Sequence, residues 1–341
     1  MSQTTSTQIQ LAARPQGWPT HDDFRTATVE YGDLRPGEVR VQNAYISVDP
    51  YMRGRMNDVK SYTPPFALGE TMTGGAIGRV IESAAEQLPV GTLVQHDLGW
   101  RDIAQADASA FRAVPELPGV PLSVRLGILG MTGMTGYVGL TAVAGMREGD
   151  TVFVSGAAGA VGTAAGQIAR LLGAKRVIGS AGSAEKVALL TEKYGYDAAF
   201  NYKDAPVREQ LAEIAPEGID VFFDNVGGDH LEAALDVMND GGRIALCGAI
   251  AGYNTTEKPA GPDNMANIIT RALTLRGFTL GRYVQLAPEF QEKMAAWFAA
   301  GEIAYDETIV DGIDHAVDAF LDMMRGANTG KMLVRIADLE S

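Results

Sequence analysis

The second half of the chain alternates between short apolar runs and amphipathic stretches. A β-branched run, TVFVSG (Thr151–Gly156), predicts a strand, and the spacing of apolar residues over Ala160–Leu172 predicts a helix after it. KRVIGS predicts a second strand and Ala184–Tyr194 a second helix. Three further apolar runs predict strands with helices between them: IDVFFDNVG, GRIALCGAI and LTLRGFTL. Strands that alternate with helices indicate βαβ units and therefore an α/β, doubly wound parallel sheet.

The first 125 residues have a different pattern. Short β-like runs, EVRVQNAYISV, GGAIGRVIES and VGTLVQHDL, are separated by Gly and Pro, which predicts a small, irregular β-rich domain. After the helical stretch PEFQEKMAAWFAAG, the tail KMLVRIAD returns to β character, and we expect it to rejoin this first domain. The predicted division is residues 1–125 with 302–341 for one domain and 126–301 for the other.

A glycine-rich turn, GAAGAVG, joins the first strand of the α/β region to its helix. Ala157, Gly159 and Gly162 occupy the three small-residue positions of a G-x-G-x-x-G turn. Gly159 lets the backbone approach a pyrophosphate, and Gly162 lets the helix pack closely on the strand. The alternative is a tight βα turn without a ligand. Because strand, turn, helix and second strand follow in the required order, we favour a dinucleotide site.

The end of the second strand lacks the acid that commonly binds a ribose 2′-hydroxyl. Ser180, Ala181, Gly182 and Ser183 stand there instead, and Lys186 follows on the next helix. An ammonium near a 2′-phosphate makes a charge-assisted contact. Lys186 on its own is equally consistent with a solvated helix face, but together with the missing acid it favours NADPH over NADH.

Composition narrows the class of protein. The formal net charge is −14 over 341 residues, which argues against nucleic-acid or anionic-membrane partners. No apolar run is long enough to span a bilayer, and the start, MSQTTSTQIQ, lacks the pattern of a signal peptide, so we expect a cytoplasmic protein. Cys247 is the single cysteine, and the four histidines form no ligand pair along the sequence, so no metal site is predicted.

Motifs along nearly the whole chain, from about residue 7 to 336, resemble one family. They are YISVDPYMRGRM (Tyr45–Met56), GET, GAAGAVG, GSAEK, FNYK, FDNVGG, GRIALCGAI and GANTGK. The chain resembles the zinc-independent medium-chain dehydrogenase/reductases. Within them it is similar to the NADPH-dependent alkenal/one oxidoreductases, which include leukotriene hydroxydehydrogenase/prostaglandin reductase, plant double-bond reductases and bacterial curcumin reductase.

The resemblance implies a GroES-like substrate domain, built from the N-terminal part and the C-terminal tail, with a Rossmann NADPH-binding domain between, and it implies a homodimer. Zinc-dependent relatives carry a Gly-His-Glu signature and a lobe of four cysteines. This chain has Gly69-Glu70-Thr71 and one cysteine, so zinc alcohol dehydrogenase chemistry is not expected.

The resemblance also implies site residues. Lys186 and Tyr202 would bind the 2′-phosphate, the turn after the first strand the pyrophosphate, and Asn328 would contact the cofactor from the other domain. Two segments depart from the family: Thr132 and Gly136 replace the usual Pro and Ala, and Gly277–Gln285 differs from the usual continuation. The full predicted cofactor set is Met131, Thr135, Gly159, Ala160, Val161, Gly162, Lys186, Tyr202, Asn225, Cys247, Gly248, Ala249, Ile250, Tyr253, Phe278, Thr279, Leu280 and Asn328.

Two tyrosines are candidate catalytic residues. Tyr253 follows the GRIALCGAI strand, at the sheet edge where α/β proteins bind ligands, and its hydroxyl can donate to an oxyanion. The alternative is a tyrosine that only walls the pocket. Tyr51 lies after Asp49 and Pro50 and beside Arg53 and Arg55. It either faces a carbonyl substrate, or it packs in the core or between the domains while the arginines pair with carboxylates. Cys247 is interpreted as a small buried hydrophobe rather than a nucleophile.

The leading functional hypothesis is NADPH-dependent reduction of the C=C bond of α,β-unsaturated aldehydes or ketones. Hydride transfer to the β-carbon would give an enolate, stabilised by a tyrosine and a ribose hydroxyl of the cofactor, and a proton would reach the α-carbon. Quinone reduction by the same superfamily and a non-catalytic dinucleotide-binding module are the alternatives. Oxidation of a secondary alcohol would need a proton relay that we do not identify without zinc.

Overall fold

The computed structural model describes residues 4–257 and 260–339; the first three residues of the start considered above lie outside it. The chain divides into two compact units, at Leu126/Gly127 and at Asp306/Glu307. We call Gly127–Asp306 the α/β unit and the remainder the β unit. The boundaries expected from sequence were 125/126 and 301/302. Within the described residues, no helix combines the length and apolarity needed to cross a membrane.

The β unit is built on a mixed sheet that combines strands from the N-terminal part of the chain with two strands from its C-terminal part. Its order is β14-β15-β3-β4-β5-β7, with β6 also paired to β3, and β1 and β2 form a separate antiparallel pair. The tail strand β15 pairs antiparallel with β3, so the returning β character of KMLVRIAD places it in this sheet as expected. The strands are β1 (Thr4–Leu11), β2 (Phe24–Tyr31), β3 (Glu38–Ser47), β4 (Ala76–Ser83), β5 (Leu93–His96), β6 (Ile103–Asp107), β7 (Phe111–Ala113), β14 (Glu307–Asp311) and β15 (Lys331–Arg335), and the helices are α1 (Tyr51–Arg55) and α9 (Ala316–Met324).

A buried ion pair fixes the tail to this unit. The Lys331 ammonium lies 3.0 Å from Asp49 Oδ1 and also donates to the carbonyls of Val48 and Met332. Lys331 is 3% exposed and Asp49 4%. Because a buried charge is costly without partners, the two motifs that contain these residues, VDP and NTGK, depend on each other for stability.

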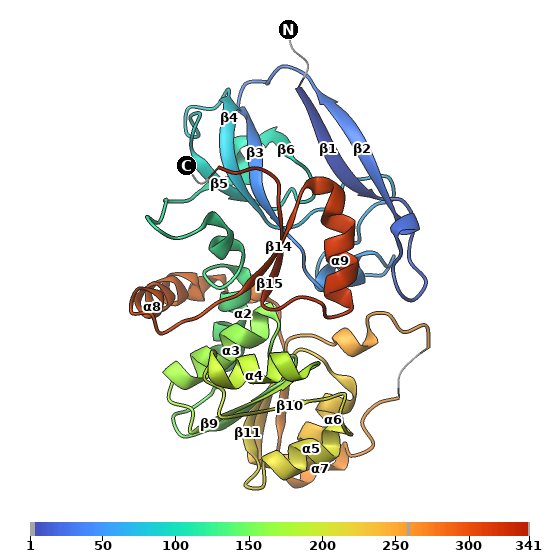
Figure 1. Ribbon diagram of the computed structural model, residues 1–341, viewed down its shortest axis with the longest axis vertical. Helices are drawn as coiled ribbons and strands as arrows, with labels where there is room; N and C mark the ends of the chain where they lie inside the picture. Colours follow the sequence, from blue (N-terminus) through green and yellow to red (C-terminus); the bar gives the residue numbers. More distant parts are fainter. Residues whose placement is uncertain (1–3, 258–259, 340–341) are drawn as a thin grey trace. The chain divides into compact units, whose positions relative to one another are not determined.

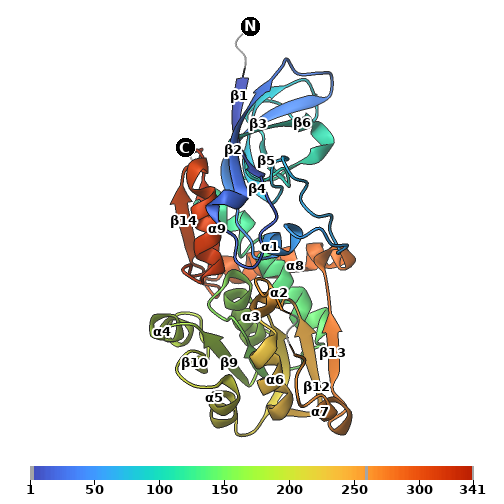
Figure 2. The ribbon, with the colours of Figure 1, turned by 90° about the vertical axis from the view of Figure 1, so that its right-hand side faces the viewer.

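The α/β unit contains a sheet of six parallel strands, with helices on both faces (Figures 1 and 2). The order β10-β9-β8-β11-β12-β13 is that of a Rossmann fold, 3-2-1-4-5-6 when the strands are numbered within the unit. The order reverses between β8 and β11, and ligands of such sheets bind at the carboxyl ends of the strands at this point. The strands are β8 (Thr151–Val154), β9 (Arg176–Ala181), β10 (Ala198–Asn201), β11 (Ile219–Asp224), β12 (Met238–Leu246) and β13 (Thr274–Gly277).

The helices of this unit follow the predicted alternation. One face of the sheet buries Phe153, Ile178, Phe200 and Phe222 against residues of α5 and α6. The apolar alternation predicted from sequence therefore produces a continuous core on this face. The helices are α2 (Met131–Val138), α3 (Ala160–Leu171), α4 (Ala184–Glu192), α5 (Val207–Ile214), α6 (Gly228–Val237), α7 (Ala266–Thr270) and α8 (Ala287–Ala299).

Two predicted strands are shorter at their carboxyl ends than expected. The run GRIALCGAI leaves the sheet after Leu246, and LTLRGFTL leaves it after Gly277. The backbone N–H groups of Cys247 and Gly248 both donate to the Asp224 carbonyl, which turns the chain away from the strand direction. The residues after these strands therefore lie in loops at the ligand-binding edge.

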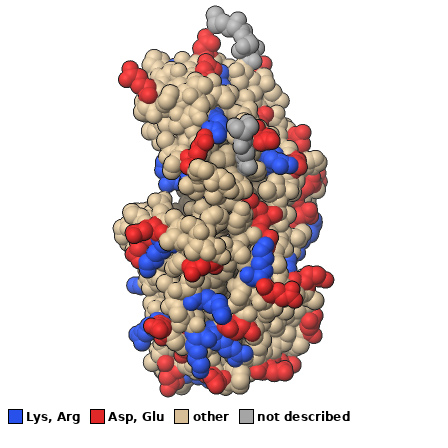
Figure 3. Space-filling view, turned by 60° about the vertical axis from the view of Figure 1, so that its left-hand side comes forward, with Lys and Arg blue, Asp and Glu red and all other residues tan. Residues whose placement is uncertain are grey.

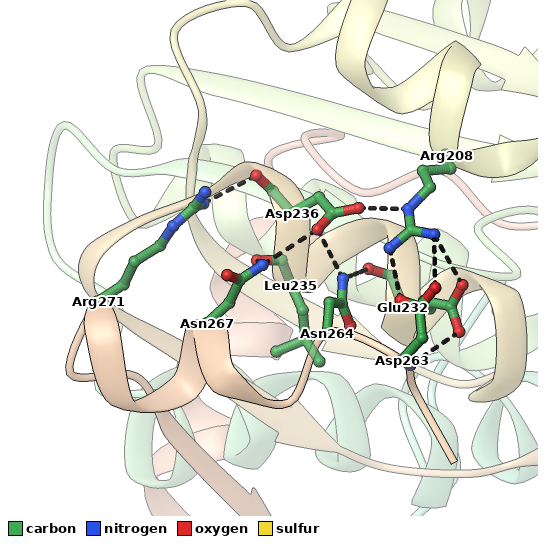
Figure 4. Close-up of polar contacts among 8 residues, drawn as sticks. All are labelled: Arg208, Glu232, Leu235, Asp236, Asp263, Asn264, Asn267 and Arg271. Atoms are coloured by element: carbon green, nitrogen blue, oxygen red, sulfur yellow. Dashed lines mark hydrogen bonds and ion pairs between the residues drawn. The ribbon is translucent and has the colours of Figure 1, made fainter. Parts of the chain in front are cut away.

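A polar network fastens the segment before β13 to the α/β unit (Figure 4). Arg208 on α5 contacts Glu232 and Asp236 on α6 and also Asp263. Burial would raise the pKa of Asp236, but hydrogen bonds from Arg208 and Asn264 outweigh this effect and hold that pKa below its ordinary value. The network stabilises the return of the chain from the loop after β12 to the edge strand β13.

Candidate functional site

The turn between β8 and α3 favours glycine at two positions, for different reasons. Gly156 has φ +59°, a left-handed conformation that favours glycine. A Cβ on Gly162 would lie 2.4 Å from the Gly156 carbonyl oxygen, so an alanine there would collide with the turn. The sequence assigned close helix packing to Gly162, and this contact is its physical form.

The N-terminus of α3 follows the carboxyl end of β8. Gly159 is its N-cap, in an extended conformation, and within the described residues no side chain caps the helix. The N–H groups of the first helical turn, over Ala160–Gly162, have no carbonyl four residues back within the helix. Such a helix start, after a glycine turn, suits an anionic group such as a pyrophosphate.

Tyr196 holds α3 against the sheet. Its hydroxyl donates to the Gly162 carbonyl at 2.8 Å. A Cβ on Gly166 of α3 would lie 2.2 Å from the tyrosine ring, and one on Gly179 of β9 would lie 2.9 Å from it. Glycine at both positions therefore leaves room for the buried Tyr196 ring. The Tyr196 hydroxyl, bonded to the Gly162 carbonyl, in turn holds the start of α3 in place. Sequence analysis did not identify this role.

The residues predicted for the 2′-phosphate gather at the ends of β9 and β10. Ser183 caps α4 by accepting a hydrogen bond from the Lys186 backbone N–H. A Cβ on Gly182 would lie 2.8 Å from the Tyr202 hydroxyl, so that hydroxyl lies against the Ser180–Ser183 turn. Burial lowers the pKa of the half-buried Lys186 ammonium, and the nearby Lys203 ammonium lowers it further. Two ammonium groups and a phenol at one place suit a phosphate.

The loops after β8 and β11 are tied together at the point where the strand order reverses. The Ser155 hydroxyl donates to Asp224 Oδ1 at 2.8 Å and accepts from the Asn225 N–H at 2.9 Å. Asn225 Nδ2 donates to the Ser155 carbonyl, also at 2.8 Å. Ser155 and Asp224 thus form a network of hydrogen bonds that sets the position of Asn225. Ser155 is not among the residues predicted from the sequence, because serine is common in βα turns.

The loop after β12 carries several predicted residues. Burial raises the pKa of the Cys247 thiol to about 12, with a further contribution from the Asp224 carboxylate, so the thiol is protonated and unsuited to act as a nucleophile. Gly248 approaches the Asn225 carbonyl so closely that a Cβ would lie 3.0 Å from it. Ala249 precedes the short 3₁₀ turn Ile250–Gly252, and Tyr253 follows this turn.

Tyr253 folds back over this loop. A Cβ on Gly248 would lie 3.5 Å from its hydroxyl. Burial raises the pKa of Tyr253 above its ordinary value, while a hydrogen bond with the Ala249 backbone acts in the opposite direction. The phenol is therefore neutral at physiological pH and able to donate a hydrogen bond.

The predicted residues on α2 and after β13 lie on neighbouring surfaces of the same unit. Thr135 donates its hydroxyl to the Met131 carbonyl at 2.7 Å. The Phe278 ring packs edge-on against Phe223 of β11, and a Cβ on Gly139 would lie 3.0 Å from it. Thr279 and Leu280 follow at the start of a 3₁₀ turn.

The two departures from the family on α2 have structural consequences. A Cβ on Gly136 would lie 3.1 Å from the Ala165 backbone nitrogen, so glycine allows α2 to approach α3 closely. Thr132 is buried, and its hydroxyl has no hydrogen-bond partner among the described residues.

The remaining candidates lie in the β unit. The Tyr51 hydroxyl is near Gly74, where a Cβ would lie 3.7 Å from it, and burial together with Asp49 raises its pKa. Arg53 donates to the Gly17 carbonyl, and Arg55 donates to the Pro64 carbonyl and lies over the Phe66 ring. These contacts with backbone carbonyls hold loops, and the Asp23 carboxylate also interacts electrostatically with the Arg53 guanidinium. Asn328 donates to the Gly330 carbonyl.

The distribution of charged side chains and of possible metal ligands also bears on the site. Figure 3 shows Lys and Arg side chains gathered on one face beside Asp and Glu, so the acidic chain still offers local positive charge. His21 and His315, far apart in sequence, both contact the exposed Asp318. In the part of the chain that the structure describes, no group of three or more His, Cys, Asp or Glu side chains is placed to hold a metal ion.

Comparison with known proteins gives consistent matches. Residues 7–114 match the model described as the N-terminal domain of oxidoreductase, and residues 160–300 match the model described as zinc-binding dehydrogenase. The chain is 39% identical to the NADPH-dependent curcumin reductase of Escherichia coli (strain K12), with 96% of each chain covered. It is 38% identical to the 2-alkenal reductase (NADP(+)-dependent) of Nicotiana tabacum, with 98% of each covered.

The fold is similarly matched by a solved structure. The crystal structure of CurA in complex with NADPH from Vibrio vulnificus superposes with a TM-score of 0.91 at 40% identity, over 97% of this chain and 99% of that one.

Proposed function

Since the chain belongs to the alkenal/one oxidoreductase group of the zinc-independent medium-chain dehydrogenase/reductases, we propose that it reduces the C=C bond of α,β-unsaturated aldehydes or ketones with NADPH. The observation that carries the proposal is the arrangement of one edge of the α/β unit. The glycine turn, the Lys186–Tyr202 region and the loop with Tyr253 all follow the carboxyl ends of strands in one sheet.

The residues at this edge fit a phosphorylated dinucleotide. The tight glycine turn, in which Gly162 packs directly on the Gly156 carbonyl, and the uncapped start of α3 suit the pyrophosphate. Lys186 and Tyr202, with Lys203 nearby, suit the 2′-phosphate. Asn225, held by Ser155, and the loop from Cys247 to Ile250 would hold the nicotinamide half, together with Met131, Thr135 and Phe278–Leu280. On the β unit, Asn328 is the residue that we assign to the same cofactor.

NADPH, when bound, supplies the hydride that adds to the β-carbon of the substrate. The chain's own contribution is orientation and electrostatics. The neutral Tyr253 hydroxyl donates a hydrogen bond to the carbonyl oxygen as negative charge develops there. The proton for the α-carbon comes from solvent or through Tyr253. Tyr51, whose raised pKa also keeps it neutral, is the second candidate donor.

Relatives support the substrate class. The curcumin reductase and the 2-alkenal reductase are both named for substrates with a C=C bond. Curcumin and 2-alkenals share a C=C bond conjugated with a carbonyl group, and a phenolic donor is suited to the enolate oxygen that their reduction forms. Homodimer formation and a cytoplasmic location stay predictions. For the dimer, the edge position and partial exposure of β13 offer a surface on which to test pairing.

The direct test is cofactor oxidation by the purified protein with NADPH and, separately, NADH. The substrates would be a medium-chain 2-alkenal, an aryl enone, a quinone and a saturated ketone. We expect NADPH-dependent turnover of the alkenal or the enone and none of the saturated ketone. Activity on the quinone alone would replace the proposal with quinone reduction. Tight NADPH binding without turnover of any of the four would contradict the proposed catalysis.

A further inference from the structure

A buried histidine lies directly behind the residue proposed to contact the 2′-phosphate. His230, in the first turn of α6, is 4% exposed, whereas Tyr202 is 39% exposed. The two rings meet edge to face, with centroids 5.5 Å apart and an interplanar angle of 74°. On its other side His230 lies parallel to Phe153 of β8, with centroids 6.5 Å apart and an angle of 7°. The imidazole therefore bridges the core of the sheet and the exposed phenol.

Ring contacts, rather than polar contacts, place this imidazole. Its Nε2 is buried and has no hydrogen-bond partner among residues 4–257 and 260–339. Burial lowers the pKa of His230 to about 4, so the ring is neutral at physiological pH. A neutral imidazole between a phenylalanine and a tyrosine behaves as an aromatic spacer.

Tyr202 has few other supports. Its backbone N–H donates to the Ala181 carbonyl, and its hydroxyl lies against Gly182, where a Cβ would be 2.8 Å away. The Lys203 ammonium lies 5.9 Å from the ring centroid, on a flexible side chain. Removal of the His230 ring would leave the phenol free to drop toward the core, away from the Gly182 turn.

We propose that His230 is a positioning residue that holds Tyr202 in place and thereby sets the preference for NADPH over NADH. Of the proposed function, this inference requires only that NADPH is the cofactor. The His230 ring acts at the 2′-phosphate end of the cofactor and not at the reacting atoms. NADH lacks that phosphate, so a displaced Tyr202 affects its binding little.

Dissociation constants for NADPH and NADH, measured by calorimetric titration without substrate, test the inference. His230→Ala is expected to raise the NADPH dissociation constant about five- to tenfold, within the range that one aromatic pair supports, and to change the NADH constant less than about twofold. His230→Phe restores an aromatic spacer and is expected to keep NADPH affinity within about twofold of the original chain.

A double-mutant cycle separates positioning from general destabilisation. In a Tyr202→Ala background, His230→Ala should have no further effect on NADPH. Leu211→Val, in the same core on α5, is the control, and it should lower thermal stability without changing the ratio of the two constants. Equal weakening of both cofactors, an effect that persists without Tyr202, or a His230→Phe variant as weak as His230→Ala would each overturn the inference.

The titrations also keep this inference separate from the proposed reaction. If the protein binds NADPH tightly but reduces no enone, the proposed reaction is wrong. The role of His230 is then still decided by the double-mutant cycle, which measures only cofactor binding. If the unmodified chain binds both cofactors equally, the cofactor preference itself is overturned, and with it the role assigned to His230.

Discussion

The Ser155 hydroxyl and the Asp224 carboxylate, 69 residues apart in sequence, form a buried 2.8 Å hydrogen bond that joins the ends of β8 and β11. Both residues are fully buried. Asp224 Oδ1 also accepts from the N–H groups of Val226 and Gly227, so one oxygen organises the whole loop after β11. The strand order reverses between these two strands. The bond therefore fixes the two loops at the point of the sheet where the proposed cofactor site lies.

Ser155→Ala should destabilise the loops after β8 and β11 and weaken NADPH binding. The change removes a donor to Asp224 and the acceptor of the Asn225 N–H, which costs about 1–3 kcal/mol of unfolding free energy when buried groups are left unpaired. NADPH affinity should fall as well, because Asn225 loses its support. Thermal unfolding and cofactor titration measure both effects. Ser109→Ala removes an exposed serine–aspartate bond as the control, and an equal loss in that variant would contradict the argument.

Gly162→Ala should damage the pyrophosphate turn. Within a helix, alanine normally stabilises relative to glycine. Here the added Cβ would meet the Gly156 carbonyl oxygen at 2.4 Å, and overpacking of this kind costs about 1–3 kcal/mol. We expect a lower unfolding temperature and loss of binding for both NADPH and NADH. Gly54→Ala, at a helical glycine with open space around it, is the control. Unchanged cofactor binding in Gly162→Ala would remove the turn from the site.

Lys186→Ala should act on one cofactor only. The loss of a charge-assisted contact with the 2′-phosphate is expected to weaken NADPH binding by about tenfold or more. NADH binding should stay within about twofold, since that cofactor has a hydroxyl at this position. Lys175→Ala, which removes an exposed ammonium paired with Glu217, is the control. If both cofactors weaken equally, the assignment of Lys186 to the phosphate is wrong.

Tyr253→Phe should lower kcat and leave the NADPH dissociation constant nearly unchanged. Loss of an oxyanion donor reduces kcat by about 100-fold in well-organised sites, and we expect at least about tenfold here. Steady-state kinetics with a 2-alkenal gives kcat and KM separately. Tyr51→Phe serves as the comparison, and Tyr305→Phe, at a tyrosine whose ring stacks on Phe298, serves as the control. Unchanged kcat in Tyr253→Phe, with a loss in Tyr51→Phe, would transfer the donor role to Tyr51.

His96 should make the β unit sensitive to acid. Its Nε2 lies 2.8 Å from Asn43 Oδ1, and its Nδ1 accepts the Leu98 N–H at 3.1 Å, an arrangement that requires a neutral ring. Burial, with the Arg101 charge, lowers the pKa of His96 from 6.5 to about 3. The unfolded chain therefore binds more protons between these values, and stability falls as pH drops from 6.5 toward 3.

Unfolding free energies measured between pH 6.5 and 3 test whether His96 causes this loss of stability. His96 should contribute a slope of up to about 1.4 kcal/mol per pH unit. His96→Gln should be less stable at neutral pH but should show a shallower acid dependence than the original chain. A variant at position 96 with an unchanged slope would contradict the assignment.

The sequence by itself determined the α/β architecture and the glycine turn. Apolar periodicity and glycine spacing are local properties, so Thr151–Val154, the turn and α3 could be predicted within a residue or two of their ends. The resemblance carried by short motifs gave the family, and the comparisons confirm it. The prediction of NADPH rested on a missing acid and one lysine, both visible in a single stretch.

Tertiary structure alone decided the contacts that hold these motifs in place. Asp49 and Lys331 are 282 residues apart, and no local pattern pairs them. The carboxyl ends of β12 and β13 were predicted too long, because backbone bonds to the Asp224 carbonyl, and not propensity, end the first of them. His230 lies on α6, yet its ring partners are Phe153 within β8 and Tyr202 after β10. Such pairings depend on which strands lie side by side, and that order forms only when the sheet does.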